Sequence, residues 1–261
     1  VREQDALGLV IRDFVNPTLE ERPDPLGDLE AFHTESILAD LGIVERRLER
    51  LKKDRSDPFE QDIFERMKEV LEEEKPLRSL GDDELNREGL KGYGLLTDIP
   101  VLVVLNCEEP KAGDSLPSDL KDRLEGLFAD GISLSAAVES DIAELDSADQ
   151  EEFLNDLGVS EPALSRLIRT SYGLLDLISF FTVGTDEVRA WNILRGTNAS
   201  GAAGCIHTDL ERGFIRAEVT PCETLLDLGS EQAVKEAGKL QVVGKDHVIT
   251  DGDIMHVLFN V

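Results

Sequence analysis

Three short runs of apolar residues punctuate the first half of the chain. They are DALGLVIRDF at residues 5–14, VLVVL at 101–105 and GISL at 131–134. Apolar runs without polar alternation are typical of strands buried on both faces of a parallel sheet. Helical segments separate the runs, so the order predicts parallel strands joined by right-handed crossovers, an α/β arrangement.

Between the first two runs the hydrophobic spacing becomes helical. From residue 29 onward, apolar positions separated by four, three, four and three residues form an a/d seam: Ile37, Leu41, Val44, Leu48 and Leu51. After a break at residues 56–58, a second helix places four residues on one face: Ile63, Met67, Val70 and Leu71. The two stripes predict an antiparallel helical hairpin, followed by a connecting helix pair over 77–97. Core packing explains such stripes, and a partner-docking arm is the alternative.

The pattern changes again after residue 175. Before it, residues 146–177 indicate two helices with Gly158 as a stop signal. After it come five short β-type runs, ISFFTVG, VRAWNILRG, FIRAEV, KLQVVG and DIMHVLFNV, with one helical stretch over 199–212. Short strands separated by Gly and Asp predict a small mixed sheet holding one helix, in a separate domain.

Composition narrows the classes of function. The 261 residues carry 27 basic and 55 acidic side chains, a net charge of −28. This charge opposes non-specific attraction to DNA or anionic membranes, and no apolar run approaches the ~18 residues needed to span a bilayer. Cys107, Cys205 and Cys222 are too scattered for a disulfide framework, and we interpret them as buried or idle thiols of a cytoplasmic protein.

Two candidate histidine sites carry little chemistry. Cys205, His207 and Asp209 are close in sequence but lack the second ligand pair of a zinc site, so we interpret them as a core thiol and a polar turn. His33 has no nearby nucleophile and is interpreted as a satisfied or exposed histidine. We predict no catalytic residue and no metal ligand.

The second apolar run ends in a polar loop with a suggestive spacing. Asn106 is followed three positions later by Glu109, with Cys107 between them. GTPases read their base with an Asn and an acidic residue at this spacing, in a loop at the carboxyl end of a strand. Glu places its carboxylate one methylene further out than Asp, which makes adenine admissible. Taken alone, the pattern is equally typical of an ordinary polar loop.

A second loop strengthens the nucleotide interpretation. The third apolar run continues into SAAVE, in which Ser135, Ala136 and Ala137 are small residues. In nucleotide folds such a loop packs against the base, because bulky side chains would fill the space that the base needs. Two such loops on adjacent parallel strands predict a slot for a purine ring.

With these two loops, the sequence resembles the YchF-type (Obg-like) ATPases of the TRAFAC P-loop class. The resemblance covers residues 4–261 and is most specific in AAGCIHTDLERGFIRAEV and GKDHVITDGDIMHVLFNV. It implies part of a P-loop domain (residues 1–26 and 95–175), a helical hairpin inserted at 27–94, and a TGS domain of β-grasp form at 176–261. It further implies ATP or GTP as ligand, with ATP preferred, and a base site formed by the following residues: Asn106, Cys107, Glu109, Ser135, Ala136 and Ala137.

The resemblance also defines a departure from the family. The phosphate loop, the Mg²⁺-binding Thr and the D-x-x-G segment of these ATPases precede the point where this sequence begins. We therefore expect no hydrolysis by these residues alone, Mg²⁺ only in the complete protein, and self-association through the exposed edge of the first strand. The alternative is a binding module, in which hairpin and TGS domain dock a ribosome, RNA or protein and the nucleotide is only regulatory. The last 86 residues, with 7 basic and 13 acidic side chains, give RNA little support.

Overall fold

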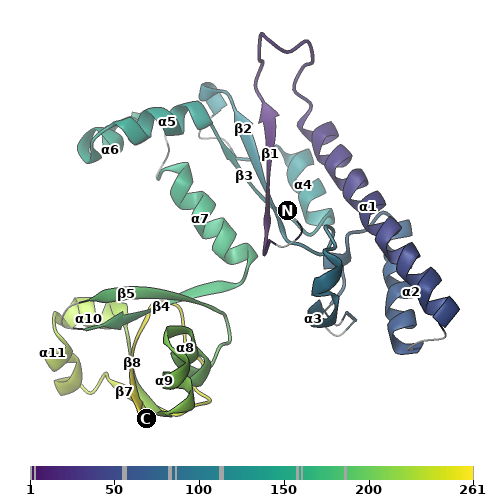
Figure 1. Ribbon diagram of the computed structural model, residues 1–261. Coiled ribbons are helices and arrows are strands. Elements are labelled where there is room, and N and C mark those ends of the chain that lie inside the picture. The colour runs from purple at the N-terminus through teal and green to yellow at the C-terminus, as the bar shows by residue number, and fades with distance from the viewer. Residues whose placement is uncertain are drawn as a thin grey trace. The chain divides into compact units, whose positions relative to one another are not determined.

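The computed structural model describes residues 2, 4–54, 58–81, 84–85, 87–111, 115–156, 159, 161–184 and 187–260. The chain divides into two compact units, residues 1–174 and 175–261 (Figure 1). The predicted break at residues 56–57 and the predicted stop at Gly158 lie outside the described residues.

A three-stranded parallel sheet organises the first unit. Its strands are β1 (Leu7–Asp13), β2 (Val101–Cys107) and β3 (Asp130–Leu134), in the order β1-β2-β3. Leu7 pairs with Val101, and Leu102 pairs with Asp130. All five residues from 101 to 105 are buried, as expected for a central strand covered on both faces. The three predicted strands and their parallel pairing are confirmed.

Helices α1 (Pro25–Asp54) and α4 (Ser118–Gly126) contribute to the core on this sheet. Leu29 of α1 and Leu120 and Leu124 of α4 share one buried cluster with strand residues. At Gly131 the helix α4 comes close to β3, since a Cβ there would lie 2.6 Å from Leu124 Cδ1. By contrast, β1 is an edge strand and Val10 is 67% exposed on it. Self-association through this edge stays a prediction.

A second cluster joins α1 to α2 (Pro58–Glu72). Seven of the nine predicted stripe residues are buried in it, and the other two, Leu41 and Ile63, are partly buried against it. The buried ones are Ile37, Val44, Leu48, Leu51, Met67, Val70 and Leu71. Surface ion pairs accompany this packing, among them Lys68 with Glu45 at 2.9 Å. Plain hydrophobic burial therefore accounts for the stripes.

The segment after α2 is anchored by two buried charged groups. The carboxylate of Asp40, fully buried in α1, accepts from Leu96 N at 3.0 Å and from the backbone N and Oγ1 of Thr97 at 2.7 and 2.8 Å. Arg78 donates to the carbonyls of Leu127, Phe128, Thr97 and Ile99, and burial lowers its pKa to about 10. Each charge is thus surrounded by backbone dipoles that offset its desolvation.

The predicted helix pair over 77–97 is wrong. Its described residues, 77–81, 84–85 and 87–97, contain only short helical turns: η1 (Leu77–Ser79), α3 (Arg87–Leu90) and η2 (Lys91–Tyr93). Pro76 lies in extended conformation at the start of η1, and Gly94 ends η2 at a positive φ of 59°. These two residues stop any longer helix. Downstream, the first unit continues with η3 (Glu109–Lys111), α5 (Ala136–Glu144), α6 (Ser147–Asp156) and α7 (Ala163–Leu174).

The second unit contains a five-stranded mixed sheet. Its strands are β4 (Leu177–Val183), β5 (Val188–Leu194), β6 (Phe214–Pro221), β7 (Gln241–Val243) and β8 (Asp253–Phe259), in the order β5-β4-β8-β6-β7. β4 and β8 are parallel and the other pairs are antiparallel. All five predicted strands are confirmed.

The helices of the second unit differ from the prediction of one. The stretch 199–212 divides into α8 (Ala199–Ile206) and α9 (Thr208–Arg212), and two further helices follow, α10 (Cys222–Leu228) and α11 (Glu231–Glu236). Small residues of α8 pack on one face of the sheet around the fully buried Phe180. Trp191 is partly buried against this core. Cys205 is exposed, so the interpretation of a core thiol is wrong there; its thiol lies 3.5 Å from the carbonyl oxygen of Asn192 on the edge strand β5.

Candidate functional site

The two predicted base loops lie side by side at one edge of the parallel sheet. β2 and β3 stay paired up to Asn106 and Leu134, so both strands end together. The side-chain Oδ1 of Asn106 accepts a hydrogen bond from the backbone N of Ala136 at 3.0 Å. The side-chain amide of Asn106 therefore fixes the start of the segment that contains Ala136.

Cys107 is directed into the protein at this edge. It is 3% exposed, and its thiol lies 3.2 Å from the carbonyl oxygen of Leu134 and 3.4 Å from that of Lys111. Ser133 Oγ lies 3.7 Å from the same sulfur. The buried thiol packs between β3 and the loop that follows β2, and so holds the loop against the sheet.

Glu109 and its neighbours form the exposed part of the loop. Glu109 begins η3 with an exposed side chain. Lys111, two residues on, reaches back to Asp13 at the end of β1, with 3.0 Å between Nζ and Oδ2. The hydrogen bond to Asp13 raises the pKa of Lys111. The sequence prediction missed this pair, because its two residues are 98 positions apart in the chain.

Ser135, Ala136 and Ala137 differ from the predicted loop in conformation. Ser135 is the extended N-cap of α5, and the two alanines open the helix with exposed side chains. The Ser135 hydroxyl is buried, and no partner for it exists among the described residues. The first N–H groups of a helix have no partner within the helix. The site is therefore a helix N-terminus with small side chains, which presents backbone donors beside Asn106.

Two contacts link this site to α7, and neither was predicted. The carboxylate of Glu139, on the first turn of α5, accepts from Ala163 N at 2.9 Å and from Leu164 N at 3.4 Å. Arg166 of α7 donates to the carbonyl of Ser133 at 3.2 Å. Acidic groups stabilise helix N-termini, so Glu139 fixes the start of α7 against α5.

Other candidate chemistry gains little from the structure. His33 is buried and its Nε2 lies 2.8 Å from the carbonyl of Glu74, which confirms a satisfied histidine. His207 accepts from Asp209 N at the start of α9. Over the residues that the structure describes, no cluster of three or more His, Cys, Asp or Glu is arranged to hold a metal ion. Likewise, none of the described helices is long and apolar enough to cross a membrane.

Comparisons with known proteins agree on one family. Residues 177–260 match the family model YchF-GTPase_C, described as "Protein of unknown function (DUF933)". The ribosome-binding ATPase YchF of Haemophilus influenzae is 42% identical over 274 residues, covering 100% of this chain and 74% of the relative. The protein of the same name from Bacillus subtilis is 40% identical, with 100% and 75% covered. Obg-like ATPase 1 of rice (Oryza sativa) is 34% identical, with 100% and 69% covered.

The fold comparison points the same way. The solved structure of the Schizosaccharomyces pombe YchF GTPase matches with a TM-score of 0.85 at 31% identity, over 98% of this chain and 73% of that one. A parallel sheet with helical crossovers, followed by a separate mixed sheet, defines an α/β protein of the class to which that structure belongs. The chain belongs to the YchF (Obg-like) ATPase family.

Proposed function

We propose that the residues at the ends of β2 and β3 form the base-recognition part of a YchF-type ATPase. The purine ring occupies the edge where β2 and β3 end, between Asn106, Cys107 and Glu109 on one side and the start of α5 on the other. The hydrogen bond from Ala136 N to Asn106 Oδ1 carries this proposal, because it joins the two segments in one rigid frame. The ATPase and GTPase names of the relatives supply the ligand class.

Each group has a distinct role in the proposed site. Ser135, Ala136 and Ala137 leave room for the flat face of the base, since none has a bulky side chain. The exposed carboxylate of Glu109 accepts from the exocyclic amine of adenine, and its position one methylene further out than that of Asp removes the match to the N1/N2 edge of guanine, so we propose ATP as the preferred ligand. Mg²⁺ and hydrolysis require a phosphate loop, and the 261 residues contain no G-x-x-x-x-G-K-[ST] motif. The proposal for these residues is therefore base binding without hydrolysis.

Calorimetry with adenosine, AMP, ATP and GTP tests this. If recognition is confined to the base, the three adenine ligands bind with similar affinity and GTP binds more weakly. Glu109→Ala removes a hydrogen bond to a charged group and should weaken the binding of adenosine by about 10-fold. Glu108→Ala, at an equally exposed neighbour, is the matched control and should leave affinity unchanged. Equal effects of the two variants, or ATP binding far more tightly than adenosine, would contradict the proposal.

We further propose that the chain docks on the ribosome as a cytoplasmic protein. The name of the bacterial relatives, ribosome-binding ATPase, favours this. The remaining parts of the proposal are a G domain at 1–26 and 95–175, an antiparallel hairpin inserted at 27–94 and a TGS domain of β-grasp form at 176–261. In the binding-module alternative, hairpin and TGS domain dock the ribosome, RNA or a protein, and the nucleotide only regulates docking.

Co-sedimentation with ribosomes separates docking from nucleotide binding. The exposed Arg189 lies over the ring of the partly buried Trp191, 4.1 Å from its centroid, and cation–aromatic pairs of this kind suit RNA. Arg189→Glu should reduce the co-sedimenting fraction severalfold more than Lys239→Glu, which makes the same charge change at another exposed residue. Glu109→Ala should leave docking intact under the module alternative and weaken it if docking requires nucleotide.

A further inference from the structure

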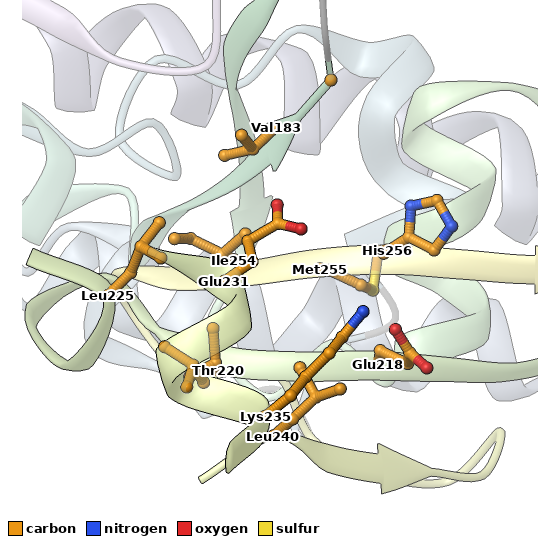
Figure 2. A pocket seen from close by; sticks show the side chains of 12 residues that line it. Val183, Glu218, Thr220, Leu225, Glu231, Lys235, Leu240, Ile254, Met255 and His256 are labelled. Carbon is orange, nitrogen blue, oxygen red and sulfur yellow. The ribbon is translucent and has the colours of Figure 1, made fainter. Parts of the chain in front are cut away.

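A cavity of about 460 Å³ lies within the second unit, on the face of the sheet beside α10 and α11 (Figure 2). Its floor comes from β6 and β8, where Thr220 pairs with Ile254 and Glu218 pairs with His256. The alternate residues on β6, Ala217 and Val219, are buried in the core around α8. Side chains alternate across a strand, so the cavity and the core occupy opposite faces.

Apolar side chains form most of the wall. They come from α10, α11, β8 and the segment before β7: Leu225, Val234, Leu240 and Ile254. The volume falls within the ~300–1,000 Å³ typical of small-molecule sites, which combine an apolar lining with a few polar groups. The cavity is thus suited to the apolar body of a small ligand.

Four ionisable side chains also line the cavity, and their charges are not matched by the protein. They are Glu218, Glu231, Lys235 and His256. Within the described residues, no hydrogen bond or ion pair of their side chains is found. Figure 2 shows Lys235 extending toward the Glu218 end, while Glu231 extends from α11 toward Ile254. Glu231 and Lys235 are exposed and Glu218 is partly exposed, so these charged groups are solvated and free to pair with a bound ligand.

Thr220 adds a buried polar group with the same property. The residue is 5% exposed, it lines the cavity, and its hydroxyl is without a hydrogen-bond partner in the described part of the chain. A buried hydroxyl left unpaired is destabilising, and it calls for an explanation such as a water or a ligand.

We infer that this cavity binds a small zwitterion with an apolar body, of the class of free apolar amino acids. The ligand's ammonium pairs with Glu231 or Glu218, its carboxylate pairs with Lys235 and accepts from Thr220, and its apolar side chain lies against Leu225 and Val234. A nucleoside phosphate fits poorly, because two carboxylates and one ammonium line the walls. This binding is separate from the nucleotide and ribosome proposals above.

Calorimetry on the whole chain with four related probes tests the inference. The probes are L-phenylalanine, 2-phenylethylamine (no carboxylate), 3-phenylpropanoate (no amine) and L-serine (no apolar body). L-phenylalanine should bind, and each of the other three should bind at least about 10-fold more weakly, since each lacks one recognised group. Absence of L-phenylalanine binding, or equal binding of any of the other three, would overturn the inference.

Variants then assign the groups. Lys235→Gln should weaken the binding of L-phenylalanine and 3-phenylpropanoate but not that of 2-phenylethylamine. Glu231→Gln should weaken the binding of L-phenylalanine and 2-phenylethylamine but not that of 3-phenylpropanoate. Thr220→Val, which keeps the shape, should weaken L-phenylalanine while leaving the ligand-free melting temperature unchanged or higher. Lys239→Gln, an exposed lysine not among the lining residues, is the matched control. Equal effects of Lys235→Gln and Lys239→Gln would remove the cavity as the site.

Discussion

The two sheets of the molecule place their polar groups differently. In the first unit, β2 is buried along residues 101–105, and polar side chains first occur where the strand ends, at Asn106. In the second unit, β6 alternates, with Ala217 and Val219 in the core and Glu218 and Thr220 facing the other way. A sheet covered on both faces can present chemistry only at its ends, whereas a sheet with one core face can build a cavity on the other.

The largest effect should come from emptying the two cores. Phe180→Ala in the second unit and Leu105→Ala in the first should each cost about 2–5 kcal/mol of unfolding free energy. Trp191 is the single tryptophan and belongs to the second unit, so its fluorescence reports that unit alone. Phe180→Ala should lower the denaturant midpoint seen by fluorescence, and Leu105→Ala should lower only the midpoint seen by circular dichroism. Coincident shifts in both signals would show one cooperative unit instead.

Two buried aspartates give the next comparison. Asp40 in the first unit accepts hydrogen bonds from three buried or partly buried groups, Leu96 N, Thr97 N and Thr97 Oγ1, and a longer one of 3.4 Å from the exposed Arg2. Asp253 in the second unit accepts two, from Thr250 N and Thr250 Oγ1 at 2.9 and 2.8 Å. Removing an acceptor leaves each buried donor unpaired, so Asp40→Ala should cost about 3 kcal/mol and Asp253→Ala about 2. Urea unfolding measures both, and a larger loss for Asp253→Ala would refute this counting of donors.

Two asparagines separate a proposed binding role from a capping role. Asn106 Oδ1 accepts from Ala136 N, and Asn198 Oδ1 accepts from Gly201 N at 2.9 Å as the N-cap of α8. Replacing either by Ala should cost about 1 kcal/mol of stability. Only Asn106→Ala should also weaken adenosine binding in calorimetry. If Asn198→Ala weakens it as much, the effect is one of stability and not of the site.

The smallest effect concerns surface charge. The hydrogen bond from Arg47 lowers the pKa of Glu60 below its ordinary 4.5, with a further contribution from Tyr93. A depressed pKa stabilises the folded state above the unfolded pKa, and this is lost as pH falls through the folded value. Glu60→Gln should therefore cost about 0.5–1 kcal/mol at pH 7 and nothing at pH 3, measured by urea unfolding. Asp176→Asn in the second unit, which breaks a more exposed pair with Arg195, should cost less. A Glu60→Gln loss that persists at pH 3 would rule out the charge as its cause.

The sequence predicts the strands well because their apolar runs have a length and composition that helices do not share. Helices α10 and α11 were missed because seven and six residues are too short to display a helical period. Their signals were local: Gly229 adopts a positive φ of 77°, and the Ser230 hydroxyl accepts from Ala233 N. The cavity depends on these helices, so it could not be predicted either.

The sequence predicted which segments of the candidate site lie next to each other, but not their conformation or their hydrogen bonds. Strand order alone places Asn106 beside Ala136. That Ala136 begins a helix, and that its N–H is taken by Asn106, depends on the backbone turn at Ser135, which sequence spacing does not define. The ion pair of Lys111 with Asp13 joins residues 98 positions apart, and no local pattern reports such a distance.

The carboxylate of Glu139 couples this site to the helix α7. Glu139 lies three residues after Ala136 on the same short helix and grips the first N–H groups of α7. α7 ends at Leu174, and the chain then enters the second unit directly. Any ligand that tilts α5 must therefore stretch or break the hydrogen bonds between Glu139 and α7. A movement of one helical turn of α5 is thus transmitted to the last helix before the second unit.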